Sequence, residues 1–386
     1  ATLYSRLKGE GDEAPLVLLQ HLDVIPANPD EWSKEPFGGE VRDGYAWGRG
    51  ALDMKGLGIA HLMTFLALYR SQEPLRRDII LLATADEEKG SELGLAWFLD
   101  NYGQLVENAG FALTEGGTNI TVDGKVAFFG IETTQKVPLW LRLTVKGPSG
   151  HGAVPPRETA SKRLIRALSR VLHLPMKPRI GPRVTHFFEN LQEFYPQGLK
   201  ATIEKIRLGE IEERELVALS PAIRALLTDT VTLTVVQAGE NTNVVAPVAF
   251  AELDCRLLPG TSPEEFLTRV VAAIDDPAVQ IEPILSGEPN ASEENPELLT
   301  AIRQAAKITG FDAKVGSSVL AGFTDSRLLR AHGIASYGFS PFQMDQMEVG
   351  GVHAQNERIA LDDFERGLRF FYRVIEQLAL PPRSVP

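Results

Sequence analysis

Short apolar runs that end in polar residues organise the first third of the chain. Residues 16–22, 78–84 and 111–114 are runs of this kind, typical of strands buried on both faces of a largely parallel sheet. Residues 56–69 and 91–102 between them have helical spacing. Strand and helix therefore alternate, and we expect an α/β sheet with flanking helices whose sites lie outside the carboxyl ends of its strands.

A different pattern begins near residue 138, where the predicted order of elements becomes β-α-β-β-α-β. These elements are a strand at 139–146, a helix at 160–172, strands at 231–236 and 248–258, a helix after Ser262 and a strand at 279–285. This order is typical of a ferredoxin-like module, interrupted here by a mostly helical insertion at about 175–228.

Helical spacing returns after Asn290, and the last predicted helix covers about 361–378. We therefore expect two domains, which agrees with a length of 386 residues. The first is a mostly parallel α/β domain made of residues 1–135 and 290–386. The second, residues 136–289, is an inserted α+β lid domain.

Composition excludes several classes of protein. Subtracting 51 acidic from 39 basic residues leaves a net charge of −12, which repels nucleic acid and anionic lipid. The longest apolar-rich stretch, 57–69, is shorter than the roughly 20 residues that cross a bilayer, so we expect a soluble protein without a membrane span. The chain starts at Ala1 with no leader pattern, and cytoplasmic and processed periplasmic or secreted locations both stay open.

Histidine and acidic residues stand at or just after the ends of the predicted strands. His21 and Asp23 lie two positions apart, so both side chains face one side and the carboxylate can orient the imidazole for metal binding. Taken alone, a core histidine beside a turn aspartate is the commoner explanation. Cys255 is the sole cysteine, so a metal site must use His, Asp and Glu.

Further candidates follow other predicted elements. They are Asp53 in the glycine-bracketed loop 48–56, Asp86, Glu87 and Glu88 after the strand 78–84, Glu115 after the strand 111–114, and His353 far down the chain. Each has an ordinary explanation, such as a helix N-cap at Asp53 or a solvated acidic loop at 86–88. Gathered carboxylates repel one another unless a cation joins them, however, and their convergence favours a metal site.

Five of these residues supply nitrogen and oxygen ligands, enough for two zinc ions that share one carboxylate: His21, Asp53, Glu88, Glu115 and His353. Glu87 is left over, and it can serve as general base toward a bridging water whose pKa zinc lowers to about 7. Cobalt or manganese also suits such ligands, and zinc is favoured by geometry and common usage.

Six spaced motifs, in this order over nearly the whole chain, resemble the di-zinc aminoacylase and carboxypeptidase family that includes acetylornithine deacetylase and succinyl-diaminopimelate desuccinylase. They are residues 21–24, 48–56, 86–88, 114–117 and 149–152, and His353. Residues 32–37, 230–239 and 324–327 look closest to its carboxypeptidase S and N-acyl-amino-acid hydrolase branch.

The resemblance implies roles for the metal-site candidates. Asp53 would bridge two metal ions, His21 and Glu115 would complete one site, and Glu88 and His353 the other. Glu87 would be the catalytic base.

The resemblance also implies roles in the predicted lid domain. His151 would polarise the substrate carbonyl, often from the neighbouring subunit, so a homodimer through the lid is expected. From spacing alone, a histidine in a surface turn is the commoner explanation of His151. Asn243 and Arg256 look like contacts to a substrate carboxylate, which a guanidinium fork suits. Thr324 and Arg327 are further substrate-binding candidates.

The chain departs from the family pattern at three points. Thr114 stands where the branch usually has aspartate, which leaves Glu115 as the carboxylate of that motif. A pair of small residues usually follows the lid histidine, and in this chain the pair is Gly152 and Ala153. The family normally has another helix and strand before Ala1, so we expect either a missing N-terminal piece or a short member.

These observations predict a hydrolase that cleaves an amide bond next to a free carboxylate, in a short peptide or an N-acyl amino acid. Two alternatives remain open. A two-metal phosphoesterase would use the same ions, although few Lys or Arg residues accompany the motifs. A catalytically silent protein would use the metals only to bind a ligand.

Overall fold

The structure is a computed structural model and describes residues 2–191, 194, 197–344 and 350–381. Its larger sheet has eight strands in the order β1-β5-β2-β6-β16-β8-β15, with β7 paired to β8. The strands are β1 (Leu3–Leu7), β2 (Glu13–His21), β5 (Arg77–Thr84), β6 (Phe111–Thr114), β7 (Thr118–Val122), β8 (Lys125–Gln135), β15 (Lys314–Leu320) and β16 (Ser336–Gly338).

The centre of this sheet is parallel. Strand β2 runs parallel to β5 and β6, and β16 runs parallel to β6. The register sets His21 opposite Thr84 and Leu18 opposite Leu113. The carboxyl ends of β2, β5 and β6 therefore meet at one edge, and the residues that follow them are brought together.

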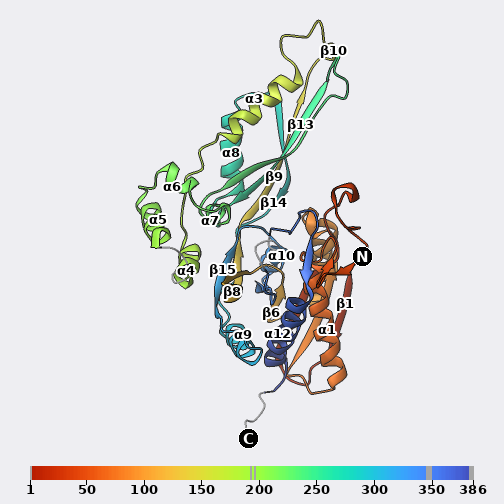
Figure 1. Cartoon of the computed structure of the whole chain (residues 1–386). Coiled ribbons are helices and arrows are strands. Elements are labelled where there is room, and N and C mark those ends of the chain that lie inside the picture. The colour runs from red at the N-terminus through yellow and green to blue at the C-terminus, as the bar shows by residue number, and fades with distance from the viewer. Residues whose placement is uncertain (1, 192–193, 195–196, 345–349, 382–386) are drawn as a thin grey trace.

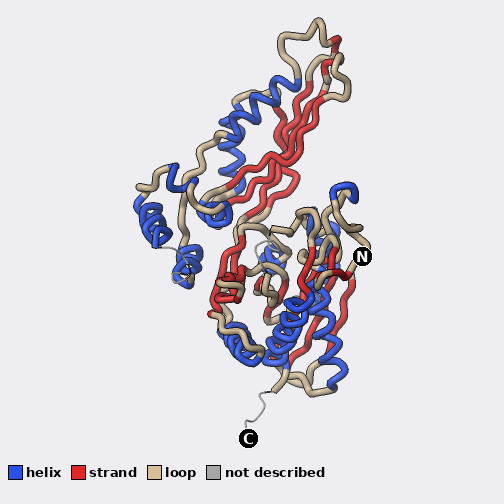
Figure 2. The backbone as a smooth tube through the Cα atoms, in the orientation of Figure 1, coloured by secondary structure: helices blue, strands red, loops and turns tan. Residues whose placement is uncertain are grey.

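Helices cover both faces of the large sheet (Figures 1 and 2). Leu16 and Leu18 of β2 pack with α1 (Lys55–Ser71), α9 (Pro296–Ile308) and α12 (Leu361–Ala379). Val17 and Leu19 pack on the opposite side with α2 (Trp97–Tyr102) and α10 (Ser326–Ala331). Alternate residues of one strand thus enter two separate cores, as a sheet covered on both faces requires. We call this sheet with its helices the large unit.

A second sheet has four antiparallel strands in the order β11-β13-β9-β14. It is formed by β9 (Val137–Lys146), β11 (Thr230–Ala238), β13 (Val248–Leu257) and β14 (Val279–Ser286). The helices α3 (Ala160–Leu172) and α8 (Pro263–Ile274) pack on it and close an apolar core that contains Leu143, Leu164 and Phe266. The predicted β-α-β-β-α-β order is found, and we call these elements the small unit.

The small unit extends away from the large sheet (Figure 1). At its far end, β10 (Gly150–His151) pairs antiparallel with β12 (Val244–Val245). We call this pair of strands the tip. Its position matters because His151 and the neighbouring Asn243 were predicted to take part in catalysis and binding.

The predicted helical insertion consists of α4 (Pro182–Asn190), α5 (Gln197–Leu208), α6 (Glu213–Val217) and α7 (Pro221–Leu227). Its apolar core includes Phe128 of β8 and Val319 of β15. The rings of Phe128 and Phe187 lie 6.2 Å apart. The insertion, which the sequence assigned to the lid domain, therefore packs against the edge of the large sheet.

The predicted fold class, a mostly parallel α/β sheet with flanking helices, is confirmed. One helix begins later than expected: residues 92–96 form a π-turn, and regular helix starts only at Trp97. The cause is Gly94, whose φ and ψ of −107° and −109° are not helical. A side chain there would meet the backbone oxygen of Ala85. In the part of the chain that the structure describes, no helix is long and apolar enough to cross a membrane.

Candidate metal centre

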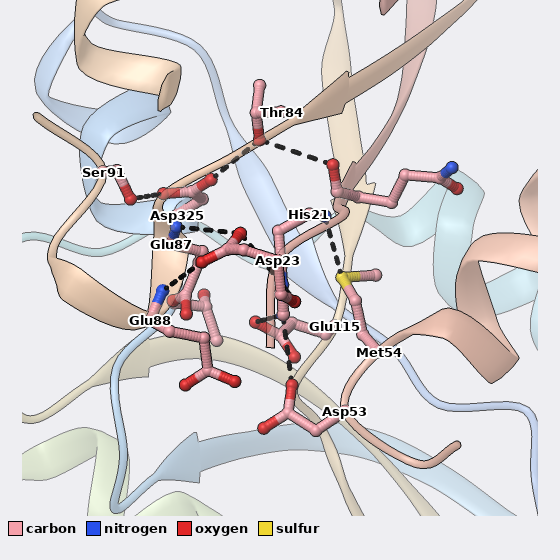
Figure 3. Close-up of polar contacts among 12 residues, drawn as sticks. His21, Asp23, Asp53, Met54, Thr84, Glu87, Glu88, Ser91, Glu115 and Asp325 are labelled. Carbon is pink, nitrogen blue, oxygen red and sulfur yellow. Dashed lines mark hydrogen bonds and ion pairs between the residues drawn. The ribbon is translucent and has the colours of Figure 1, made fainter. Parts of the chain in front are cut away.

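The strand ends gather the predicted acidic and histidine residues into one cluster (Figure 3). His21 is the last residue of β2, Glu115 follows β6, and Glu87 and Glu88 form a short turn shortly after β5. Asp53 comes from the loop before α1. That helix begins at Lys55 with Met54 as its N-cap, so the ordinary explanation of Asp53 as an N-cap is wrong.

The first set of possible metal ligands is His21, Asp53 and Glu115. Nε2 of His21 lies 3.1 Å from Oδ1 of Asp53 and 3.5 Å from Oε1 of Glu115. The ligand atoms of the set all lie within 4.8 Å of one another. A single ion can therefore contact all three side chains with only small adjustments.

The second set is Asp53, Glu88 and His353. Nε2 of His353 lies 3.1 Å from Oδ2 of Asp53 and 3.1 Å from Oε2 of Glu88. Asp53 thus turns one carboxylate oxygen to each set. This is the arrangement of a carboxylate that bridges two cations.

The charges of the cluster fit divalent ions. Burial and then the Asp53 carboxylate raise the pKa of Glu115 to about 8. Hydrogen bonds to Asp53 and Glu88 raise the pKa of His353 to about 10. Burial alone would lower the pKa of His21, but Glu115 and the other carboxylates outweigh it and raise this pKa. Each histidine is thus held where a positive charge is favoured, which a metal ion also supplies.

Asp23 supports both the histidine and the acidic turn. Its backbone oxygen lies 2.9 Å from Nδ1 of His21, and its Oδ1 lies 3.5 Å from the same nitrogen. The carboxylate also accepts the backbone N–H groups of Glu87 and Glu88, both at 3.2 Å. The backbone oxygen of Asp23, and not the carboxylate that was predicted to do so, therefore makes the hydrogen bond to the His21 ring, while the carboxylate fixes the turn that carries the two glutamates.

Glu87 lies among these groups and is 6% exposed. Burial, followed by the nearby Glu115 and Asp325 carboxylates, raises the pKa of Glu87 well above its usual value. Its Oε1 has no hydrogen-bond partner among the described residues. A buried acid with a spare oxygen at the edge of a cavity suits proton transfer.

Comparison with known proteins agrees with this geometry. Residues 17–377 match the peptidase family M20/M25/M40. The chain belongs to this family. It is 33% identical to an N-fatty-acyl-amino acid synthase/hydrolase of Xenopus tropicalis, PM20D1, over 94% of this chain and 72% of that protein. It is 27% identical to a probable carboxypeptidase S-like protein of Dictyostelium discoideum, over 94% of this chain and 72% of the relative.

Comparison with solved structures shows the same fold. An M20 family metallo-carboxypeptidase from Sulfolobus solfataricus superposes with a TM-score of 0.76 at 21% identity, covering 97% of this chain and 87% of that one. The chain is thus an M20-family hydrolase of the metallopeptidase and aminoacylase type. The phosphoesterase and silent-binding alternatives are set aside accordingly.

A cavity of about 600 Å³ adjoins the cluster of acidic and histidine residues and is lined by both units. The small unit contributes Trp140, Asp254 and Arg256, and the large unit contributes Phe323. The Arg256 guanidinium lies 4.4 Å from the centre of the Phe323 ring. It donates to both carboxylate oxygens of Asp254, at 2.6 and 2.9 Å. Arg256 therefore lines the cavity, with part of its guanidinium already bound to Asp254.

The polar groups of the other two substrate-binding candidates, Thr324 and Arg327, make hydrogen bonds to other residues of the chain. Thr324 lines the cavity, but its backbone N–H and its hydroxyl both donate to Oε1 of Gln135 at 3.1 Å. Arg327 is buried and donates to the backbone oxygen of Gly90 at 2.6 Å. These contacts give no support to substrate binding by Arg327.

His151 and Asn243 lie together at the tip, where the Gly152 N–H donates to the backbone oxygen of Asn243 at 2.7 Å. Nδ1 of His151 accepts the N–H of Ala153 at 3.0 Å, and the side chain is exposed. The tip lies at the end of the small unit that is farther from the large sheet (Figure 1), whereas the cluster lies at the strand ends of that sheet. Within one chain, these two candidates are therefore not brought to the site.

Several residues at the site escaped the sequence analysis. Trp140 and Asp254 alternate with buried positions on their strands and gave no separate signal. Asp325 belongs to a recognised motif, but its buried contacts to Ser91 and Thr84 at the back of Glu87 depend on the fold (Figure 3). Glu357 follows His353 by four positions, a spacing that could have marked it.

Proposed function

We propose that this chain hydrolyses the amide bond next to a free carboxylate, in an N-acyl amino acid or a short peptide. The observation that carries the proposal is the double role of Asp53, whose two oxygens face His21 and His353 separately. Glu87 lies beside the same cluster with an unused oxygen. Together these features support a two-ion site with its own general base.

The residues that would hold two zinc ions fall into two sets. His21, Asp53 and Glu115 form one, and Asp53, Glu88 and His353 form the other. Cobalt or manganese would suit the same nitrogen and oxygen donors. When bound, such ions polarise a carbonyl group and lower the pKa of a water molecule.

Glu87 is the residue placed to move the proton. Its Oε1 accepts a proton from the attacking water and passes it to the nitrogen of the leaving amine, so one carboxyl group serves both halves of the reaction. Burial favours this, because it raises the pKa of Glu87 well above its usual value. The hydrogen bond from its backbone N–H to Asp23 fixes the backbone from which the side chain projects.

The cavity wall suggests how the substrate is held. Arg256 offers positive charge for the carboxylate, since only part of its guanidinium is engaged by Asp254. Ile25, Leu320 and Phe323 give the cavity an apolar side suited to an acyl chain or an apolar side chain. A relative named as an N-fatty-acyl-amino acid hydrolase supports the acyl alternative.

The remaining assignments complete the proposal. Residues 1–135 and 290–386 would form the catalytic domain, and residues 136–289 a lid. His151 at the tip would stabilise the oxyanion in the site of a partner subunit, and Asn243 would contact the substrate there. This arrangement needs a homodimer, because the tip of the same chain is remote from its own cluster.

A substrate panel tests the proposal. The purified enzyme, loaded with zinc, would be assayed on N-acyl amino acids with short and long acyl chains, on dipeptides, and on the same compounds with the carboxylate amidated. We expect turnover that disappears when the carboxylate is amidated. Equal turnover of the amidated compounds, or none on any member of the panel, contradicts the proposal.

A further inference from the structure

Glu357 is a buried carboxylate that none of the assignments above uses. It lies directly before β17 (Arg358–Ala360), and its side chain is 1% exposed. Strand β17 pairs with β4 (Tyr45–Trp47), with Arg358 opposite Trp47. The Gly48 N–H then donates to the Glu357 backbone oxygen at 3.0 Å. This pairing brings Glu357 beside the loop 48–56 that carries Asp53.

Both carboxylate oxygens of Glu357 accept hydrogen bonds from that loop. Oε1 accepts the backbone N–H of Leu52 at 2.7 Å and that of Asp53 at 3.2 Å. Oε2 accepts the backbone N–H of Gly50 at 3.0 Å and Nη1 of Arg49 at 2.7 Å. Four donors on one carboxylate satisfy its charge, and hydrogen bonds to an ionised acceptor are the stronger kind.

Arg49 extends the connection to the second loop of the cluster. Its Nη2 lies 3.4 Å from the backbone oxygen of His353, and its guanidinium stacks over the Trp32 ring at 5.1 Å. The Arg49 side chain is 5% exposed, so the ion pair with Glu357 is shielded from water. The pair therefore joins the chain segment of Asp53 to that of His353.

We propose that Glu357 is a positioning residue that sets the placement of Asp53 relative to His353. The inference rests on the proposed function, because only a two-ion site requires Asp53 to present one oxygen to each set. A purely structural ion pair would need Arg49 alone. The three backbone amides, one of them that of Asp53 itself, fix the course of the loop at the bridging residue.

Asp229 provides a matched control. It is also a buried carboxylate, 4% exposed, that accepts a backbone N–H, from Leu258 at 2.7 Å, and an arginine nitrogen, from Arg179 at 3.0 Å. These hydrogen bonds, and the one from the Thr261 hydroxyl, all come from residues outside the loops of the metal cluster. Asp229→Asn therefore reproduces the loss of a buried charge without touching those loops.

The experiment measures zinc binding to metal-free wild type, Glu357→Gln and Asp229→Asn by competition with a chromophoric chelator. Glutamine keeps the shape of the side chain but presents one oxygen and an NH₂ group to the donors of the loop. We expect Glu357→Gln to weaken zinc binding by about tenfold to a hundredfold, the usual effect of losing a partner behind the ligands. Asp229→Asn should lower the melting temperature and leave zinc binding unchanged.

Two outcomes overturn the inference. One is a Glu357→Gln protein that melts earlier but binds zinc as tightly as wild type, while the wild type hydrolyses its substrate; the proposed function then stands and Glu357 is structural. The other is equal weakening of zinc binding by Asp229→Asn. A wild type that neither binds zinc nor hydrolyses any substrate instead removes the proposed function.

Hydrogen exchange of the metal-free wild type covers the case in which Glu357→Gln does not fold. The amides of Gly50, Leu52 and Asp53 should be protected before any metal is added, because Glu357 already accepts them. Exchange of these amides at the rate of an unstructured chain, with protection only after zinc addition, contradicts the inference. The double variant Arg49→Met with Glu357→Gln, which leaves no unpaired charge, gives the same zinc comparison in a folded protein.

Discussion

The metal cluster and the tip of the small unit are built in opposite ways. The cluster is fixed by several layers of contacts, since Asp23 binds the backbone of Glu87 and Glu88 while Glu357 binds the loop of Asp53. The tip is a two-residue pairing with an exposed histidine. The first is preorganised within one chain, whereas the second gains a function only if another surface meets it. Substitutions in the two regions should therefore fail in different ways.

The largest fall in kcat is expected for a substitution of Glu87. Glu87→Gln keeps the shape of the side chain but cannot take up a proton, so we expect kcat to fall about 10²-fold to 10⁴-fold. Zinc content should stay at the wild-type level, because Glu87 belongs to neither ligand set. Steady-state kinetics and metal analysis of the same sample check both statements. A variant with near-normal kcat would show that another group moves the proton.

The second-largest fall in activity is expected for a substitution of His151, and mixing two variants should restore part of that activity. We expect His151→Ala to lower kcat about 10²-fold to 10³-fold, the usual cost of removing an oxyanion donor. If the tip serves a partner subunit, mixing this variant with Glu87→Gln under exchange of subunits creates one intact site per mixed dimer. Random pairing then restores roughly a quarter of the wild-type activity. Absence of any recovery, with subunit exchange verified, would exclude the shared site.

A substitution of Arg256 should affect substrate binding more than the chemical step. Arg256→Ala should raise KM by about tenfold to a hundredfold with a smaller change in kcat, because a charge-assisted hydrogen bond contributes about 1.5–3 kcal/mol. Asp254→Asn is the matched control, since it frees the guanidinium that Asp254 now binds. It should leave KM equal or lower it. A fall in kcat alone for Arg256→Ala would mean that the arginine does not hold the substrate.

The smallest effect is a loss of stability of the large unit at acid pH. His61 of α1 is fully buried against Phe371, with ring centres 4.8 Å apart, and burial lowers its pKa to about 3. The unfolded chain takes up a proton near pH 6.5, so stability is full above that pH and decreases as the pH falls toward 3. By pH 5.5 we expect a loss of about 1.4 kcal/mol.

The variant His61→Phe isolates this contribution. Urea unfolding of the wild type and of His61→Phe at pH 7.5 and 5.5 should show a smaller decrease in the variant. The surface substitution His332→Phe, which replaces an exposed histidine, serves as its control. Equal decreases in wild type and His61→Phe would show that His61 does not cause the acid sensitivity.

The contrast between the two regions also explains what the sequence could predict. Strands β2, β5 and β6 carry unbroken apolar runs and end in polar residues, so both the strands and the convergence of His21, Glu88 and Glu115 follow from the pattern. The predicted order of the small unit followed in the same way. The helical insertion was placed with the lid, because a sequence pattern does not tell which sheet a helix face covers.

Contacts between segments far apart in the chain could not be predicted from the sequence pattern for the same reason. The hydrogen bonds from the Asp53 loop to Glu357 depend on the register of β4 and β17, two strands of three residues each that show little periodicity. Gln135 and Thr324 likewise meet only because two strand ends are brought together. Thr324 and Arg327 were predicted to bind substrate because they belong to a family motif. The motif does not show that their polar groups make hydrogen bonds within the chain.

Counting metal ions in the bridging variant tests the central claim most directly. Wild type, Glu115→Gln and Asp53→Ala would be saturated with zinc, dialysed and analysed for zinc per chain alongside turnover. If Asp53 serves both sets, wild type should retain about two ions, Glu115→Gln about one, and Asp53→Ala less than one, with activity lost in both variants. Retention of both ions by Asp53→Ala, or a fully active wild type with no bound metal, would contradict the account.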